Sequence, residues 1–204
     1  MITLILGDSK FPNLIIKSLK RKKKDFFIID LSKKNIFRKE KNSFRFSIGK
    51  FGSMINLIKN KKSKKVLFAG KIHKPNFSKL RLDLKGILYM PSVIKASKLG
   101  DAAIIKSIIN ILEKEKIKVV RSNLFNTELT LKKGNYTRLK PIKDDKKTIQ
   151  VGVNFFKKVN KLDHIQAIAV KKNKIIAKED KGGTKKMLSK MKKNSGAILI
   201  KFPK

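Results

Sequence analysis

The chain has 204 residues, of which 41% are hydrophobic, so it is long enough for one large globular domain or two smaller ones. It carries 53 Lys and Arg residues against 14 Asp and Glu, a formal net charge of +39, and it has no Cys, which excludes disulfides and thiolate metal sites. No stretch approaches about eighteen uncharged apolar residues, and no basic segment precedes the apolar start, so we expect neither a membrane-spanning helix nor a signal peptide.

The first part of the chain alternates between expected strands and expected helices. A β-branched run at residues 2–6 ends at Gly7, and apolar residues at helical spacing follow, with Pro12 in the first turn of the expected helix. A second apolar strand lies within "DFFIIDL", residues 25–31. The order strand, helix, strand predicts parallel strands joined by a right-handed crossover.

The same alternation continues with a helix at "FGSMINLIKNKK", a strand at "KKVLFAGK" that stops at Gly70, a helix at "GDAAIIKSIINILEKEKI" and a strand at "KVVRSN". We therefore predict an α/β fold with a Rossmann-like layered N-terminal domain and a mostly parallel sheet over residues 1–125. Ligands of such domains bind at the carboxyl ends of the strands. The single glycine of "GDSKFP" does not match the dinucleotide-binding fingerprint, so NAD binding is not supported.

From about Leu124 the sequence becomes polar and loses any sustained period, so we assign residues 126–145 to a linker. We expect a second, smaller α/β (α+β) domain over residues 146–204. It begins with a helix at "IQVGVNFFKKVNKLD" and continues with a hairpin in whose "KKNK" turn Asn173 can take a positive φ. A helix at "TKKMLSKMKK" and a strand at "GAILIKFPK" complete it. Because the chain ends on this strand, we expect a C-terminal segment to be missing.

Few motifs carry recognisable chemistry. The loop "KEDKGGTKKML", residues 178–188, has glycines whose backbone N–H groups can wrap an anion, but it lacks the Walker spacing and is not a P-loop. No G-x-S-x-G nucleophile elbow occurs, which argues against an esterase of that type. His73 and His164 lie far apart in the sequence, and we propose no His-based site.

Carboxylates are scarce in this chain, so those beside a glycine or a strand end are candidates for function. Two of them also have a structural interpretation, because Asp101 fits a helix N-cap or first turn and Asp163 fits a turn cap. A few such carboxylates together with substrate phosphates could hold Mg²⁺. The candidates are Asp8, Asp83, Asp101, Asp163, Glu179 and Asp180.

Five motifs, in order and spacing, resemble those of one known family over nearly the whole chain. "FAGKIHKPNFSKL" is similar to the family's A-G-x-[VI]-x-[RK]-P strand end, and "LGDAAIIKSIINILEKEKIKVV" to its G-D-D-x-L-L helix with the following strand. "LDHIQAIAVKKNKIIAKE" resembles its D-x-G-Q hairpin, "GGTKKML" its E-G-T-D-x-[ML] loop, and "GAILIKFPK" its G-x-L-x-K-x-x-K strand. The family is that of the bacterial UDP-2,3-diacylglucosamine pyrophosphatases of the LpxI type.

The resemblance implies an enzyme of lipid A biosynthesis. Such enzymes use Mg²⁺ and water to cleave UDP-2,3-diacylglucosamine into UMP and 2,3-diacylglucosamine 1-phosphate (lipid X). The resemblance also implies a cytoplasmic protein that contacts the inner membrane from its surface, with no specific nucleic-acid partner, and it leaves a homodimer open.

Candidate site residues follow from these motifs. We expect Glu179 and Thr184 to be catalytic, with Glu179 also the best carboxylate for the metal, Thr184 a donor to a phosphate oxygen and Gly183 a point of close backbone approach. The expected substrate-binding residues are Gly7, Asp8, Gly70, Lys71, Pro75, Gly100, Asp101, Asp163, Gln166 and Gly183.

The chain departs from the family motifs at several of these positions. Gly182 and Lys185 stand where the family has the Glu and the Asp of E-G-T-D, and Ala102 and Ile165 replace an Asp and a Gly of the other motifs. An ammonium group in place of a carboxylate repels Mg²⁺. A catalytically impaired relative that binds the nucleotide-lipid without hydrolysing it is therefore an alternative to the active enzyme.

The charge offers a third hypothesis, a basic nucleic-acid-binding protein. Only six of the cations are Arg, however, although the bidentate guanidinium is the group that favours phosphate recognition. Lys shares A/T-rich codons with the abundant Ile, Asn and Phe, so we interpret the excess charge mainly as a genomic base bias on a solvated surface. No RNP, KH or helix-turn-helix signature favours the nucleic-acid hypothesis.

Overall fold

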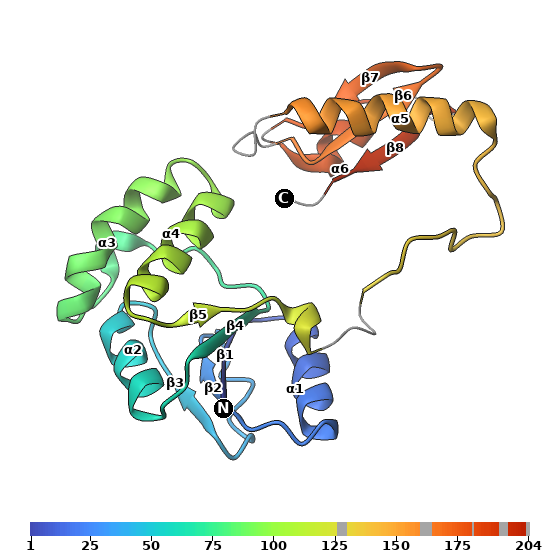
Figure 1. Ribbon diagram of the computed structural model, residues 1–204. Coiled ribbons are helices and arrows are strands. Elements are labelled where there is room, and N and C mark those ends of the chain that lie inside the picture. Colours follow the sequence, from blue (N-terminus) through green and yellow to red (C-terminus); the bar gives the residue numbers. More distant parts are fainter. Residues whose placement is uncertain (126–129, 160–164, 181, 192–195, 203–204) are drawn as a thin grey trace. The chain divides into compact units, whose positions relative to one another are not determined.

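The structure, a computed structural model, describes five stretches of the chain: residues 1–125, 130–159, 165–180, 182–191 and 196–202. It divides into two units, Met1–Lys132 and Lys133–Lys204 (Figure 1). The first unit contains a parallel sheet with helices, and the second contains a smaller antiparallel sheet. The predicted α/β class with two domains is confirmed.

The first unit is built on one five-stranded sheet in the order β3-β2-β1-β4-β5. Every neighbouring pair runs parallel, which confirms the parallel sheet expected from the alternation of strands and helices. The central strand β1 pairs with β2 on one side and with β4 on the other. The strands are β1 (Ile2–Leu6), β2 (Phe26–Asp30), β3 (Ser43–Arg45), β4 (Lys65–Ala69) and β5 (Lys118–Val119).

Helices cover both faces of this sheet (Figure 1). Leu4 packs in the same core as Ile15 of α1, whereas the next residue, Ile5, packs in a second core with Ile55 of α2 and Leu112 of α4. This division follows because successive side chains of a strand point to opposite faces. The helices are α1 (Phe11–Arg21), α2 (Phe51–Asn60), α3 (Leu84–Ser97) and α4 (Asp101–Lys114), with short 3-10 turns η1 (Phe77–Lys79) and η2 (Ser122–Leu124).

Neither α3 nor the short strand β3 was expected from the sequence. Gly86 and Pro91 inside α3 weaken its helix signal, because glycine is too flexible and proline lacks a backbone N–H. The start of α3 is fixed instead by Asp83, whose carboxylate accepts hydrogen bonds from the N–H groups of Gly86 (2.8 Å), Gly52 (3.0 Å) and Ser53 (2.8 Å). One carboxylate therefore caps both α2 and α3.

In the second unit, helix α5 packs on a three-stranded antiparallel sheet in the order β7-β6-β8, and the short helix α6 lies between β7 and β8 in the sequence. Phe156 of α5 packs with Ile168 and Val170 of β6 to form its core. A side chain at Gly152 would overlap Ile200, so the glycine lets α5 approach the sheet closely. The elements are α5 (Lys143–Lys158), β6 (Ala167–Lys171), β7 (Lys174–Lys178), α6 (Gly183–Ser189) and β8 (Ile198–Lys201).

The hairpin between β6 and β7 has the expected turn. Lys172 and Asn173 take φ values of 46° and 61°, so the positive φ predicted for Asn173 is confirmed.

Helix α5 begins at Lys143, and its first turn carries Asp144 and Asp145, where carboxylates complement the helix dipole. The first three residues of this helix, 143–145, lie inside the segment that we assigned to the linker. Among the described helices, none combines the length and the apolar composition needed to cross a bilayer.

A second carboxylate, that of Glu115, joins three helices of the first unit. Glu115 lies at the end of α4, its side chain is only 9% exposed, and it accepts hydrogen bonds from Lys59 of α2 and from Lys85 (2.5 Å) and Tyr89 (2.8 Å) of α3. Burial raises the pKa of this carboxyl, but the hydrogen bonds from Lys59, Lys85 and Tyr89 outweigh it and lower the pKa from 4.5 to about 2. The network therefore favours the charged carboxylate and holds α2, α3 and α4 together.

Replacing Glu115 should weaken the first unit in a pH-dependent way. We expect Glu115→Gln to lower the free energy of unfolding by about 2 kcal/mol at neutral pH, because two ammonium groups lose their partner. Since the folded pKa is the lower one, the stabilisation is complete above pH 4.5 and is lost as the pH falls toward 2. Urea unfolding at several pH values measures the difference. The exposed Glu113 provides the control variant Glu113→Gln, and equal effects of the two variants would contradict this account.

Candidate functional site

The carboxyl ends of β1 and β4 meet at the centre of the first sheet. The chain passes from β1 through α1 to β2 on one side of β1, while β4 lies on its other side, so the strand order reverses here. The Gly7 N–H donates to the Ala69 carbonyl (2.9 Å), and the Asp8 N–H donates to the Lys71 carbonyl (2.8 Å). In open α/β sheets such a reversal forms the crevice in which ligands bind. The structure thus brings together Gly7, Asp8, Gly70 and Lys71.

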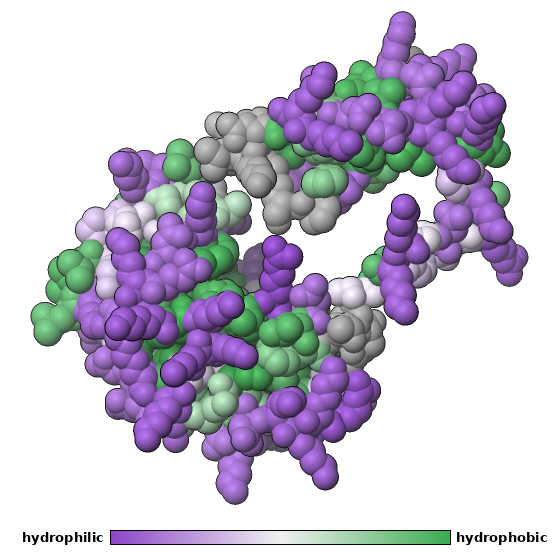
Figure 2. Space-filling view, in the orientation of Figure 1, coloured by the Kyte–Doolittle hydropathy of each residue, from purple (hydrophilic) through white to green (hydrophobic). Residues whose placement is uncertain are grey.

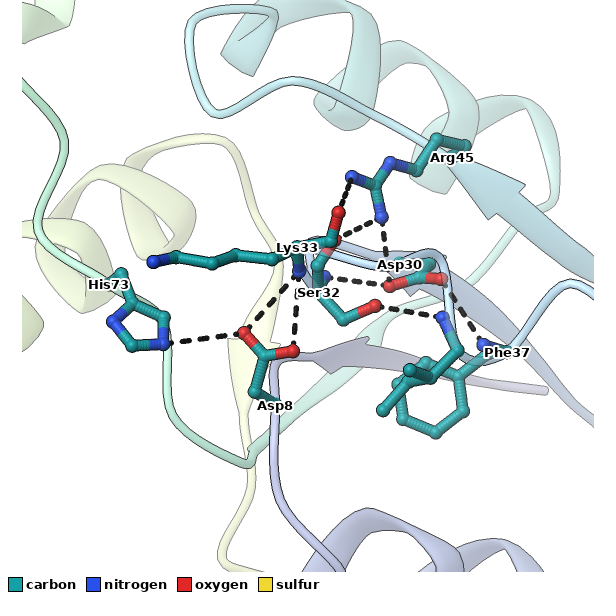
Figure 3. Close-up of polar contacts among 8 residues, drawn as sticks. Asp8, Asp30, Ser32, Lys33, Phe37, Arg45 and His73 are labelled. Carbon is teal, nitrogen blue, oxygen red and sulfur yellow. Dashed lines mark hydrogen bonds and ion pairs between the residues drawn. The ribbon is translucent and has the colours of Figure 1, made fainter.

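Three residues form what we call the strand-end cluster: Asp8, Lys33 and His73 (Figure 3). The backbone N–H of Lys33 lies 3.3 Å from each carboxylate oxygen of Asp8, and His73 Nε2 lies 3.5 Å from Asp8 Oδ2. The side chains of Asp8 and His73 are 29% and 41% exposed, so a ligand can reach them. The Lys33 side chain extends toward His73 (Figure 3). A carboxylate beside an ammonium and an imidazole can accept from hydroxyl groups and donate to phosphates.

The loop that carries Lys33 is held by a fully buried carboxylate, Asp30, at the end of β2. Asp30 accepts hydrogen bonds from the N–H groups of Ser32 (2.7 Å) and Phe37 (3.3 Å), and Arg45 of β3 lies 3.6 Å from it. Arg45 also donates to the Ser32 carbonyl (Figure 3). Asp30, Lys33 and Arg45 were not expected as site residues from the sequence. The available signal was an Asp that closes the apolar run "FFIID" in a chain with few acids.

Gly7 and Gly70 allow the two strand ends to approach each other. A Cβ on Gly7 would overlap the Lys71 carbonyl and lie 2.9 Å from Ile72 Cγ1. Gly70 has a φ of 87°, and a Cβ there would lie 2.6 Å from the Gly7 carbonyl oxygen. These contacts give both glycines a structural reason to be present without any ligand, while substrate contact by either remains a prediction.

The other expected residues of the first unit lie at helix and loop positions. Gly100 is the N-cap of α4 with a φ of 113°, which favours glycine, and Asp101 is the exposed first residue of that helix. Pro75 lies half-buried in the stretch between β4 and η1. Among the described residues, no hydrogen bond or ion pair joins Gly100 or Asp101 to the strand-end cluster.

In the second unit, Glu179 is the centre of a polar cluster at the end of β7. Its Oε2 accepts a hydrogen bond from the Gln166 N–H (2.7 Å), and its Oε1 accepts one from the Thr184 hydroxyl (2.7 Å). Burial raises the pKa of Glu179, but the hydrogen bonds from Thr184, Gln166 and Ala167 and the charge of Lys201 outweigh it, so the pKa lies below its usual value. The structure therefore brings together Gln166, Glu179 and Thr184, and Glu179 ties β7 to β6 and α6.

A nearby cation changes the role that Thr184 can play. The Lys201 Nζ of β8 donates to Thr184 Oγ1 (3.2 Å), while the Thr184 proton is directed at Glu179. An ammonium group carries three donors, so Lys201 rather than Thr184 is the group that this arrangement offers to a phosphate. Lys201 was missed as a site residue, although it is the first Lys of the "KFPK" end that we compared with the K-x-x-K motif.

The glycine loop before α6 leaves space for a ligand. Gly183 has a φ of 80°, and no described atom lies within 4 Å of the position that a Cβ would take. The close approach of a ligand to this backbone remains a prediction. Lys185 is exposed on α6.

The described residues do not fit a magnesium site at Glu179. Both of its oxygens accept hydrogen bonds and an ammonium group lies close by, whereas Mg²⁺ needs oxygen ligands in octahedral geometry. No group of three or more His, Asp or Glu side chains converges as a metal site within the described ranges. Asp163, a further candidate, lies outside the described residues.

Comparisons with known proteins agree on one family. A family model of the LpxI N-terminal domain matches residues 1–129, and a model of the LpxI C-terminal domain matches residues 132–204. UDP-2,3-diacylglucosamine pyrophosphatase LpxI of Caulobacter vibrioides is 28% identical over 144 residues, which are 71% of this chain and 51% of that protein. The chain therefore matches about half the length of this relative.

The structural account of Gly7 can be tested without a ligand. We expect Gly7→Ala to lower the free energy of unfolding by about 2–3 kcal/mol, because the added methyl group overlaps the backbone of the neighbouring strand end. Thermal unfolding of the free protein measures it. Gly134→Ala serves as control, since no described atom lies within 4 Å of a Cβ there. If Gly7→Ala unfolds like the wild type, the glycine serves only the approach of a ligand.

The structural account of Glu179 leads to a different test. Glu179→Gln should lower the stability of the second unit by about 1–3 kcal/mol, because a half-buried network of hydrogen bonds loses its charged acceptor. Since the folded pKa is depressed, the stabilisation is present above the pKa of the unfolded state and is lost as the pH falls through the folded value. Asp144→Asn, at a side chain that is 85% exposed in the first turn of α5, is the control, and it should cost no more than about 0.3–1 kcal/mol, the contribution of a surface carboxylate at a helix start. A rise of the wild-type melting temperature on addition of Mg²⁺ that the Glu179 variant lacks would show a metal ligand instead.

Proposed function

Because the chain belongs to the LpxI family, we propose that it hydrolyses the pyrophosphate bond of UDP-2,3-diacylglucosamine in lipid A biosynthesis. The observation that carries the proposal is that the two LpxI domain models together match residues 1–129 and 132–204, one for each unit. The name of the Caulobacter relative supplies the substrate. The products would be UMP and 2,3-diacylglucosamine 1-phosphate.

The reaction consumes one water molecule. The water oxygen forms a bond to one phosphorus of the pyrophosphate, and the bond between this phosphorus and the bridging oxygen breaks. The bridging oxygen leaves with the other phosphate, and the two protons of water are shared between products and solvent. Negative charge accumulates on the phosphate oxygens in such a transition state, so the protein contributes mainly by positioning and by placing positive charge nearby.

The first unit has groups that suit the nucleotide head of this substrate. The strand-end cluster lies at the reversal of the strand order, the position where doubly wound sheets bind nucleotides. Asp8 can accept hydrogen bonds from hydroxyl or imide donors, whereas Lys33 and His73 can donate to phosphate oxygens. The buried Asp30 holds the loop of Lys33 in place, which reduces the entropy lost when a ligand binds.

The second unit has groups that suit a phosphate. Lys201 is oriented through Thr184 and Glu179, so its ammonium group is held at the start of α6 beside the open backbone of Gly183. This arrangement supports a role for Lys201 in binding charge that develops on phosphate oxygen, with Thr184 and Glu179 as positioning residues. A Mg²⁺ requirement is part of the proposal only as an implication of the family, since the described side chains give the ion no ligand set.

The place of action follows from the substrate. A lipid with two acyl chains resides in a membrane, and uridine nucleotides are cytoplasmic metabolites, so we propose that the protein acts at the cytoplasmic surface of the inner membrane. A homodimer remains a prediction.

The activity and the role of Lys201 can be measured together. We expect release of UMP from detergent-dispersed UDP-2,3-diacylglucosamine with Mg²⁺ present, and a loss of about a hundredfold in kcat/KM for Lys201→Gln, the magnitude typical of removing one charge-stabilising donor. The exposed Lys174 on β7 gives the matched control Lys174→Gln, which should retain wild-type activity. Equal activity of the two variants would remove Lys201 from the site.

A second candidate function is motivated by Lys185, which stands where the family motif has Asp. In that case the chain binds the nucleotide-lipid without releasing UMP, and Lys185→Asp restores hydrolysis. Absence of both binding and UMP release, in the wild type and in Lys185→Asp, would contradict both functions.

A further inference from the structure

The solvent face of α3 is apolar over its first turns. Leu84, Ile87 and Leu88 are 87%, 60% and 68% exposed, and Pro91 follows on the same side. Their spacing of three and four residues places them on one helix face. Figure 2 shows apolar side chains gathered at the edge of the first unit that α3 forms. We call the surface formed by Leu84, Ile87, Leu88 and Pro91 the α3 face.

Packing within the first unit does not require the α3 face. The opposite side of the helix makes the internal contacts, since Gly86 and Met90 are buried there and Tyr89 bonds to Glu115. The three exposed side chains therefore give up the free energy that burial would provide. Contiguous apolar side chains of this kind on a monomer mark a surface that meets an apolar partner.

The charge around the α3 face is positive. Residues 84–100 contain no Asp or Glu, and Lys95 and Lys98 are exposed after the apolar turns. The preceding stretch, residues 71–82, has four Lys and Arg residues and no carboxylate, and Asp83 is occupied by capping α2 and α3. Asp101, at the start of α4, is the next carboxylate along the chain. An apolar surface bordered by Lys fits a partner that is apolar inside and anionic at its surface.

We propose that the α3 face docks the protein on an anionic lipid bilayer. Leu84, Ile87 and Leu88 would enter the boundary between head groups and acyl chains, and Lys95 and Lys98 would contact lipid phosphates, as in helices that lie in the membrane interface. A second copy of the chain is a poorer occupant, because a symmetric pair would bring the Lys residues of both copies together. The proposal rests on the proposed function in one respect: a diacylated substrate is reached at a membrane.

The structure also connects the α3 face to the candidate site. The chain runs from His73 of the strand-end cluster through η1 to the start of α3, and Lys74 Nζ donates to the Ser97 carbonyl at the end of α3 (3.2 Å). The segment that carries His73 is thus fixed to both ends of the docking helix. Docking through α3 would hold the strand-end cluster close to the membrane surface, where the head group of a lipid substrate lies.

Flotation of the full chain with lipid vesicles tests the proposal. We expect binding to vesicles of phosphatidylethanolamine with phosphatidylglycerol and little binding to phosphatidylcholine. The variant Leu84→Ser/Ile87→Ser/Leu88→Ser should bind the anionic vesicles with an affinity that is lower by about tenfold or more, since three apolar side chains no longer insert. The matched control is Leu14→Ser/Leu131→Ser/Leu139→Ser, at leucines that are 48%, 79% and 86% exposed elsewhere on the chain. This control should bind as the wild type does.

The charge contribution has its own pair of variants. Lys95→Gln/Lys98→Gln should weaken binding to the anionic vesicles and make it less sensitive to salt, because fewer counterions are exchanged at the surface. The exposed Lys17 and Lys24 give the control Lys17→Gln/Lys24→Gln, which should have a smaller effect. Equal effects of the two pairs would show attraction by net charge alone and overturn the assignment to α3.

Further outcomes separate this proposal from the proposed activity. The proposal is overturned if the α3 triple variant binds vesicles like the wild type, or if the wild type does not bind vesicles and forms a dimer that the triple variant cannot form. Vesicle binding through α3 without any UMP release supports docking while the proposed hydrolysis fails. Hydrolysis of detergent-dispersed substrate by a wild type that does not bind vesicles leaves the hydrolase and removes the docking surface.

Discussion

The close approach of β1 and β4 at their carboxyl ends is the constraint on which the first unit depends. A Cβ atom on Gly7 or on Gly70 would overlap the backbone of the other strand end, so this approach requires glycine at both positions. This contact places Asp8 opposite Lys71 and brings the stretch with His73 alongside. The same reversal of strand order separates α1 on one face from α2 and α4 on the other. A local packing requirement therefore positions both the core and the candidate site.

Carboxylates serve mainly as fixed acceptors in this Lys-rich chain. Asp30, Asp83, Glu115 and Glu179 each accept two or more hydrogen bonds from groups that are separate in the sequence. Each one closes a loop or joins helices, where an uncompensated N–H or ammonium group would be costly. Because acidic residues are scarce, the sequence singled out Asp83 and Glu179 as residues with a specific role, and both do make specific hydrogen bonds. It could not show that their oxygens are used within the protein, because their partners lie up to 31 residues away.

The first unit combines two chemically different surfaces that suit one amphipathic substrate. The strand-end cluster is polar and reachable from solvent, whereas the α3 face is apolar and bordered by Lys. The segment after β4 connects them, with Lys74 bonded to the end of α3. A diacylated nucleotide-sugar has a polar head and an apolar tail, and the proposed hydrolysis needs the head at the site while the tail stays in the bilayer.

The sequence by itself determined the alternation of strands and helices apart from β3 and α3, the parallel sheet, the hairpin at Asn173 and the family. These features depend on periodicity, glycine placement and motif order, which are local properties of the chain. Tertiary structure decided the rest. Helix α3 forms despite Gly86 and Pro91 because Asp83 caps it and Glu115 binds its inner side. Lys33 and Lys201 became candidates because folding places each of them beside a predicted site residue, Asp8 or Thr184, and sequence spacing does not encode such distances.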